Sequence, residues 1–206
     1  YLLLQLPAGI LGDRFGMKRV LLSTYAVASV GAIGLGLAVG HYAMMVLCMA
    51  VHGLGAGGFY PSSFGMMMQK TEPGRRAFSS ALIGTGMAVG LLTGMTAGGT
   101  LYEMFQSVRV PILAVALPSI LILFLFYRYL PDTKGAPAPA WAQYRAILTD
   151  WDLWRINLTT FTALYGFWVA VTWGPTFLKV ERGFSLGAAG FYTLLIHDRA
   201  IPASIF

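Results

Sequence analysis

The chain has 206 residues, of which 57% are hydrophobic and only 11% are charged. Soluble domains carry roughly 25% charged residues, so a water-soluble enzyme of this length would lack the polar surface that it needs. A single cysteine, Cys48, and the absence of a Gly-X-Y period exclude a disulfide scaffold and a collagen-like chain. The composition therefore indicates an integral membrane protein.

Long uncharged stretches divide the chain into helix-length segments. Between Arg19 and Lys70 lie 50 residues without Asp, Glu, Lys or Arg. A helix needs about 20 mostly apolar residues to cross the hydrocarbon core, so this stretch predicts two spans joined by a tight loop near Gly40. A β-barrel would instead show alternating segments of roughly ten residues. After an apolar segment at 1–9, we expect helices near 20–40, 43–68, 77–101, 109–130, 155–178 and 186–206.

The basic residues predict an orientation in the membrane. If the loop at 12–19 is cytoplasmic, ten basic residues lie in loops on that side and three lie on the other side, namely Arg109, Lys179 and Arg182. This is the bias of the positive-inside rule. Membrane topology thus accounts for the net charge of +6, and we expect the lipid bilayer, not a nucleic acid, as the partner of this basic chain.

Residues 9–19 form the most specific motif, Gly-Ile-Leu-Gly-Asp-Arg-Phe-Gly-Met-Lys-Arg. Gly9 and Gly16 allow a tight turn. Asp13 is an acid at a helix boundary, where it can pair with Arg14 or face the positive end of a neighbouring helix. A plain basic loop that only obeys the positive-inside rule is the alternative interpretation.

This motif resembles the G-x-L-A-D-R-x-G-R-K-R loop between the second and third helices of major facilitator superfamily transporters. Gly12 replaces the usual Ala, and Met17 replaces the first basic residue. The resemblance implies that the loop latches two halves of the protein on the cytoplasmic side in the outward-open state. The gate residues that it implies are Gly9, Gly12, Asp13, Arg14, Gly16, Lys18 and Arg19.

Glycines also mark two later segments. The run from Gly53 to Pro61 is similar to the fourth helix of the same family, but Met49 stands where the family has an Arg linked to proton movement. In the following segment, glycines recur every four residues, and small residues at this spacing form a groove for another helix. Pure helix packing is favoured over a substrate role for this stripe of Gly86, Gly90, Gly94 and Gly98.

An internal repeat supports two homologous halves. Leu-Pro-Ala-Gly-Ile-Leu at 6–11 matches Ile-Pro-Ala-Ser-Ile-Phe at 201–206. Parallel repeats of six helices are a known transporter architecture. We therefore expect an all-α membrane bundle of two six-helix halves, of which this chain is a fragment that contacts the remainder of its own protein. The predicted parts are 1–130, from the second to the sixth helix; 131–154, a cytoplasmic linker; and 155–206, the seventh and most of the eighth helix.

Aromatic and hydroxyl side chains follow helical spacing on two predicted helices that line the central cavity in this family. Such groups stack on a solute and hydrogen-bond to it in a partly dry cavity, although packing between helices is the alternative. The candidates are His52, Tyr60, Tyr165, Trp168 and Thr172. His52 is the strongest, because a histidine in mid-membrane needs a polar partner.

Charged residues also occur inside the last predicted helix, at His197-Asp198-Arg199. Ionisable residues within a span are costly and suggest a function. Asp198 and Arg199 are candidates for coupling or for binding the charge of a solute. An end that is not fully inserted is an equally good interpretation.

Taken together, the features favour a multi-pass transporter in the plasma membrane, specifically the bacterial inner membrane. We expect alternating access for a small organic solute, with an organic anion and symport coupled to a proton or cation as the leading form. Residues 167–178 and 182–185 loosely resemble the seventh-helix region of bacterial organic-anion symporters. The alternatives are efflux of drugs or metabolites and a non-transporting membrane interaction protein. No catalytic motif, cofactor or metal site is expected.

Overall fold

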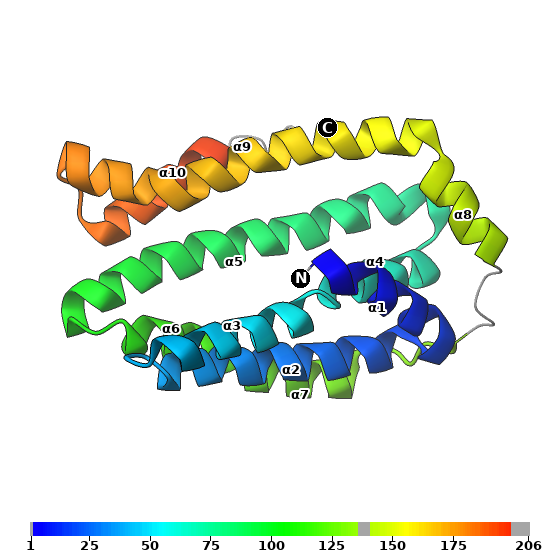
Figure 1. Ribbon diagram of the computed structural model, residues 1–206, viewed down its shortest axis with the longest axis horizontal. Coiled ribbons are helices and arrows are strands. Elements are labelled where there is room, and N and C mark those ends of the chain that lie inside the picture. The colour runs from blue at the N-terminus through cyan, green and yellow to red at the C-terminus, as the bar shows by residue number, and fades with distance from the viewer. Residues whose placement is uncertain (1, 136–140, 199–206) are drawn as a thin grey trace. The chain divides into compact units, whose positions relative to one another are not determined.

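The computed structural model describes residues 2–135 and 141–198, and every regular element in these ranges is a helix. The all-α prediction is therefore confirmed. The elements are α1 (Leu2–Phe15), α2 (Met17–Leu37), α3 (Tyr42–Ala56), α4 (Phe59–Lys70), the 3-10 helix η1 (Pro73–Arg75), α5 (Arg76–Phe105), α6 (Arg109–Ala116), α7 (Pro118–Tyr129), α8 (Trp141–Thr149), α9 (Trp151–Arg182) and α10 (Leu186–Asp198) (Figure 1).

The chain forms two compact units. The first unit comprises the described residues of 1–87 and 101–137, and the second comprises those of 88–100 and 138–206. Helix α5 contributes residues to both units. The first unit thus holds α1 to α4, α6 and α7, and the second holds α8 to α10.

Helix α2 is the central element of the first unit, and it contacts α1, α3, α4, α6 and α7. Its approach to α3, which runs alongside it in Figure 1, is close enough to bring the two backbones together. A Cβ atom on Gly31 would collide with the backbone nitrogen of His52, and one on Gly55 would lie 2.7 Å from the Cα of Ala28. Glycines on both helices therefore permit this packing.

Two of the predicted spans are interrupted. The segment expected as one helix at 43–68 forms α3 and α4, with a turn at Gly57-Gly58 between them. The segment at 109–130 forms α6 and α7, which meet at Leu117 and Pro118. Glycine lowers helix propensity and proline lacks the backbone N–H of a helix interior, so each break lies where the helix is intrinsically weakest.

In the second unit, α9 begins earlier and ends later than the predicted helix at 155–178. The Asp150 side chain accepts hydrogen bonds from the backbone N–H groups of Asp152 and Leu153, which makes it the N-cap. At the other end, Gly183 has a φ of 69°, a left-handed conformation that terminates helices. Helix α10 then packs back against α9.

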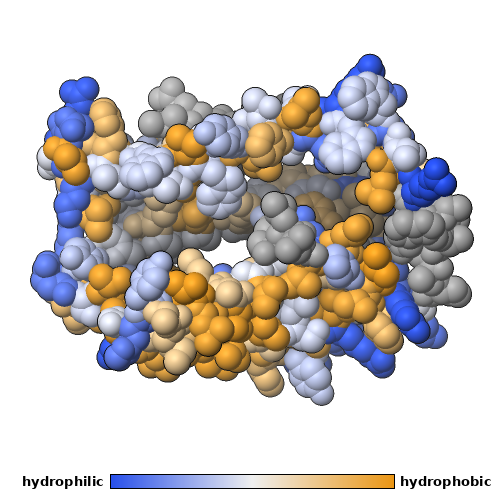
Figure 2. Space-filling model, viewed as in Figure 1, coloured by the Kyte–Doolittle hydropathy of each residue, from blue (hydrophilic) through white to orange (hydrophobic). Residues whose placement is uncertain are grey.

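Within the part of the chain that the structure describes, four segments are long and apolar enough to cross a membrane: Met17–Leu37, Tyr42–Lys70, Pro73–Phe105 and Arg109–Tyr129. Helix α9 is not among them, because its Trp, Tyr, Thr and Gly residues lower its hydropathy. Large apolar side chains on α2 and α7 are exposed, among them Val30 (68%) and Phe124 (60%). Figure 2 shows hydrophobic residues gathered over the helices around α2, as expected of a surface in contact with lipid.

The predicted glycine stripe on α5 has no neighbour at three of its positions. A Cβ atom on Gly86, Gly90 or Gly94 would meet nothing within 4 Å among the described residues. Within the second unit, α5 instead approaches α10 at Gly99, where a Cβ atom would lie 2.8 Å from the backbone nitrogen of Gly187. Packing along the stripe itself therefore stays a prediction.

Replacing Gly55 with alanine tests the backbone contact between α2 and α3. We expect Gly55→Ala to lower the free energy of unfolding by about 1–3 kcal/mol, because backbone atoms of α2 cannot move aside as a flexible side chain can. The thermal midpoint of the full-length protein in detergent measures this. Gly84→Ala is the matched control, since a Cβ atom there meets nothing within 4 Å. An equal midpoint for both variants would contradict the contact.

Candidate functional site

The candidate gate loop, residues 9–19, contains the end of α1 and the start of α2. The two helices meet at Gly16, whose φ of 97° is a conformation that other residues rarely adopt. Its N–H donates to the carbonyl of Gly12 at 2.9 Å, and its own carbonyl accepts from the N–H of Val20 at 3.3 Å. The helical hydrogen bonds of α1 thus run up to Gly16, and those of α2 start from it, so a single residue forms the turn.

The two residues that depart from the family motif, Gly12 and Met17, lie against each other. A Cβ atom on Gly12 would overlap the sulfur of Met17, which is 4% exposed. The same methionine reaches α4, where a Cβ atom on Gly65 would lie 2.8 Å from its Cε. Met17 also belongs to the apolar core of the unit with Leu21 and Met66. The room left by glycine at position 12 is therefore filled by the methionine at position 17.

The segment 131–135, which follows α7, docks on the gate loop. The ammonium group of Lys18 lies 2.9 Å from a carboxylate oxygen of Asp132. The backbone N–H of Lys18 donates to the hydroxyl of Thr133 at 2.9 Å. The hydroxyl of Thr133 thereby satisfies one of the N–H groups that the first turn of α2 leaves without a helical partner.

Glycines on both sides bring this segment close to the loop. A Cβ atom on Gly16 would collide with the carbonyl oxygen of Thr133, and one on Gly135 would collide with the carbonyl oxygen of Arg14. Backbone atoms have little freedom to move away. Side chains at position 16 or 135 would therefore displace the docked segment.

The ion pair is uneven in its exposure. The Lys18 side chain is 14% exposed, whereas that of Asp132 is 93% exposed. The hydrogen bond from Lys18 and its positive charge, together with the more distant charge of Arg19, hold the pKa of Asp132 below its usual value. Solvent screens a pair of this kind, so the close backbone contacts contribute to the docking alongside it.

The remaining charges of the gate loop are available for other partners. Asp13 is half-buried, and Arg14 and Arg19 are exposed. None of the three forms an ion pair within the described residues. The Arg14 guanidinium instead lies 5.3 Å from the centre of the Phe15 ring. Of the two partners considered for Asp13, Arg14 does not pair with it here. The loop thus holds one lysine that pairs with Asp132 and three charges that form no ion pair within the described residues.

His52 and Tyr60, both predicted to line a cavity, already have partners in the first unit. The Nδ1 atom of His52 lies 2.9 Å from the carbonyl oxygen of Ala28 on α2. A carbonyl only accepts, so Nδ1 carries the hydrogen. The hydroxyl of Tyr60 donates to the sulfur of Met87 at 2.7 Å. Contact of either side chain with a solute stays a prediction.

Tyr165, Trp168 and Thr172 are all exposed on α9 in the second unit. Tyr165 stacks on Phe161, with ring centroids 6.3 Å apart, and Trp168 packs at a tilt against Phe167. These aromatic pairs leave large parts of both ring systems uncovered. Their availability is consistent with the predicted role in stacking on a solute, which the structure alone does not assign.

Helix α10 ends at Asp198. The side chains of His197 and Asp198, and the whole of Arg199, lie outside the described residues, so the predicted charge site stays untested. Within the described ranges, no group of three His, Cys, Asp or Glu residues is placed to hold a metal ion.

Sequence reasoning missed the docking of 131–135. It interpreted these residues as the start of an extended connector. The available signal was the acid at Asp132 together with Gly135, but nothing in the spacing indicated that Lys18, 114 positions earlier, would be the partner of this acid.

A double-mutant cycle tests whether the side chain of Met17 fills the space beside Gly12. We expect Gly12→Ala to lower the thermal midpoint of the full-length protein, and to lower it less in a Met17→Ala background, with a coupling of about 0.5–3 kcal/mol. Gly9→Ala is the control, because its Cβ atom would lie at an ordinary 3.7 Å from Pro61. If the effects of the two substitutions on the thermal midpoint are additive, the two positions do not share this space.

Replacing Asp132 with asparagine tests the ion pair. Because pairing lowers the pKa of Asp132, its stabilisation is complete above the ordinary carboxyl pKa and is lost as the pH falls through the lowered value. We therefore expect Asp132→Asn to lower the thermal midpoint at pH 7 and to converge with the wild type in acid. Thr133→Val, which removes only a hydroxyl, should show the same deficit at both pH values. Equal midpoints of wild type and Asp132→Asn at pH 7 would exclude the pair.

Comparison of the sequence with known proteins places the chain in a family. The chain is 28% identical to the voltage-gated purine nucleotide uniporter SLC17A9 of Homo sapiens, over 100% of this chain and 50% of that protein. It is 28% identical to the probable anion transporter 6 of Oryza sativa subsp. japonica, over 95% of this chain and 50% of the relative. The probable sulfoacetate transporter SauU of Cupriavidus necator is 25% identical, with 95% and 49% covered.

The chain spans about half the length of the curated relatives that it matches. No solved structure matches it significantly. The family model of the Major Facilitator Superfamily matches residues 1–196, a range that contains the gate loop, its docked segment and every described helix except the last two residues of α10. The chain therefore belongs to the Major Facilitator Superfamily and is part of a multi-pass membrane protein.

Proposed function

We propose that the full-length protein is a secondary active transporter of a small organic anion that works by alternating access. The observation that carries this proposal is the gate loop, in which Asp13, Arg14 and Arg19 have no ion-pair partner among the described residues. Three charges without partners at one end of a helical unit are suited to a contact that forms in one state and breaks in another. Alternating access requires such contacts.

The substrate class is inferred from the relatives. A purine nucleotide, an unspecified anion and sulfoacetate are the substrates that their names give. All three are anionic, and an organic anion presents both a charge and an organic group. Tyr165 and Trp168 offer exposed rings for the organic group, and Arg199 is the candidate for the charge.

Ion-coupled symport is the form of transport that we favour, and uniport is the second candidate. The name of the human relative describes a voltage-gated uniporter, and Met49 stands where the family motif has an arginine linked to proton movement. These two observations make uniport, driven by the membrane potential alone, the second candidate. Symport is placed first because residues 167–178 and 182–185 of this chain resemble the seventh-helix region of bacterial organic-anion symporters. The plasma membrane, and specifically the bacterial inner membrane, is the location that we propose.

Counterflow in proteoliposomes tests the activity. The full-length protein is loaded with a dicarboxylate, a sulfonate or a nucleotide, and entry of the labelled compound is measured with no gradient, with a proton or sodium gradient, and with a membrane potential. Uptake of an anion driven by an ion gradient supports symport, and uptake driven by potential alone supports uniport. Exchange of cationic drugs or neutral sugars, but of no anion, would refute the substrate class.

Substitution of Asp13 tests the gate. We expect Asp13→Asn to reduce the initial rate of transport by about tenfold, because a coupling contact between two states is worth roughly 5- to 150-fold. Expression and thermal midpoint should stay near the wild-type values, since Asp13 forms no ion pair in the described part of the chain. Lys134→Gln is the control for a plain basic loop. Arg14→Gln should slow transport about as much as Asp13→Asn, whereas Lys134→Gln should not. If Lys134→Gln slows transport as much as Arg14→Gln does, general positive charge explains the motif and the gate is refuted.

A further inference from the structure

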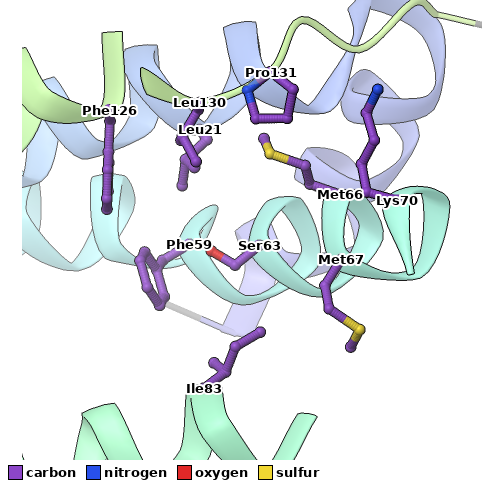
Figure 3. Close-up of a pocket in the computed structure, with 10 residues that line it drawn as sticks. All are labelled: Leu21, Phe59, Ser63, Met66, Met67, Lys70, Ile83, Phe126, Leu130 and Pro131. Atoms are coloured by element: carbon purple, nitrogen blue, oxygen red, sulfur yellow. The ribbon is translucent and has the colours of Figure 1, made fainter. Parts of the chain in front are cut away.

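A pocket of about 330 Å³ lies in the first unit, at the end where α2 begins and where α4 and α7 end. Its volume is at the lower limit of the roughly 300–1,000 Å³ typical of ligand sites. Figure 3 shows its lining side chains converging from α2, α4, α5 and α7. The lining is Leu21, Phe59, Ser63, Met66, Met67, Lys70, Ile83, Phe126, Leu130 and Pro131.

The chemistry of the lining excludes a small polar solute. Only Ser63 and Lys70 bring polar side-chain groups to this pocket. A compact anion bound there would lose most of its hydrogen bonds to water without replacement, at a high cost in free energy. The flexible thioethers of Met66 and Met67 instead adapt to an apolar guest of variable shape. The pocket therefore suits a hydrocarbon chain.

Lys70 adds a positive charge at the edge of this apolar space. It is exposed, it is the last residue of α4, and it forms no ion pair within the described residues. In Figure 3 its amine lies away from the phenylalanine side of the pocket, beyond Met66. An apolar cavity bordered by one free cation complements a molecule with a hydrocarbon chain and an anionic head.

Phospholipids with an anionic headgroup are molecules of this kind, and the membrane presents them at the end of the unit that holds Lys70. The end of the unit that holds Lys70 also holds Lys18 and Arg128, as expected for the boundary between the hydrocarbon core and the headgroups. A lysine near the surface attracts anionic lipids, and its stem can lie along an acyl chain while its amine reaches the phosphate. We propose that the pocket binds one acyl chain of an anionic phospholipid, with the headgroup phosphate paired to Lys70.

Lipid binding to the purified full-length protein tests this site. The delipidated protein is titrated with phosphatidylglycerol or phosphatidylcholine of identical chains, or with inorganic phosphate, and native mass spectrometry counts the adducts. We expect phosphatidylglycerol to bind about fivefold more tightly than phosphatidylcholine, since a single lysine near the surface supplies a preference of this size. Phosphate alone should not bind, because it has no chain to bury.

Two variants separate the head from the chain. Lys70→Gln should remove the preference for phosphatidylglycerol and keep the binding of phosphatidylcholine. Ser63→Leu, which fills the pocket, should weaken both lipids, and a thermal midpoint near wild type verifies its fold. Lys134→Gln removes an equal charge and should leave both affinities unchanged.

Three results would overturn the proposal. The first is equal binding of both lipids by the wild type, and the second is a loss in Lys134→Gln as large as that in Lys70→Gln. The third is binding of neither lipid by the wild type, which would show that the pocket takes no acyl chain. None of these readouts depends on transport, so the site fails or holds independently of the proposed function.

Discussion

The arrangement at the start of α2 depends on the turn at Gly16, which has a positive φ and no space for a side chain. Because the turn is a single residue, α1 and α2 meet closely enough for Met17 to fill the gap beside Gly12. The same absence of a side chain lets the carbonyl of Thr133 approach, so that Lys18 reaches Asp132. Helix packing, turn geometry and electrostatics thus depend on one small residue.

This arrangement gives the charges of the gate loop separate tasks. Lys18 pairs with the segment after α7, whereas Asp13, Arg14 and Arg19 form no ion pair within the described residues. A docked segment also makes the end of α7 move with the start of α2.

Sequence alone predicted those features of the fold that follow from one physical constraint. The cost of charge in hydrocarbon predicted the helices on either side of Gly40. The motif at 9–19 predicted the family that the family model confirms, whereas the role of these residues as a gate stays a prediction. Contacts between distant segments could not be predicted in the same way, because helical spacing says which residues share a face and not what lies opposite them. Gly31 and Gly55 pack against backbone, whereas the more regular stripe at Gly86, Gly90 and Gly94 faces no described atom within 4 Å.

The contacts of Lys18, Gly16 and Gly135 imply that the segment 131–135 and the gate loop move as one rigid part. Electron-electron double resonance between spin labels at Leu11 and Lys134 tests this directly in the full-length protein, since both side chains are exposed and neither is one of the three unpaired gate charges. The account predicts one narrow distance distribution that is the same with and without a transported solute. A broad distribution, or one that shifts when solute is added, would show that the segment leaves the loop and would contradict the claim.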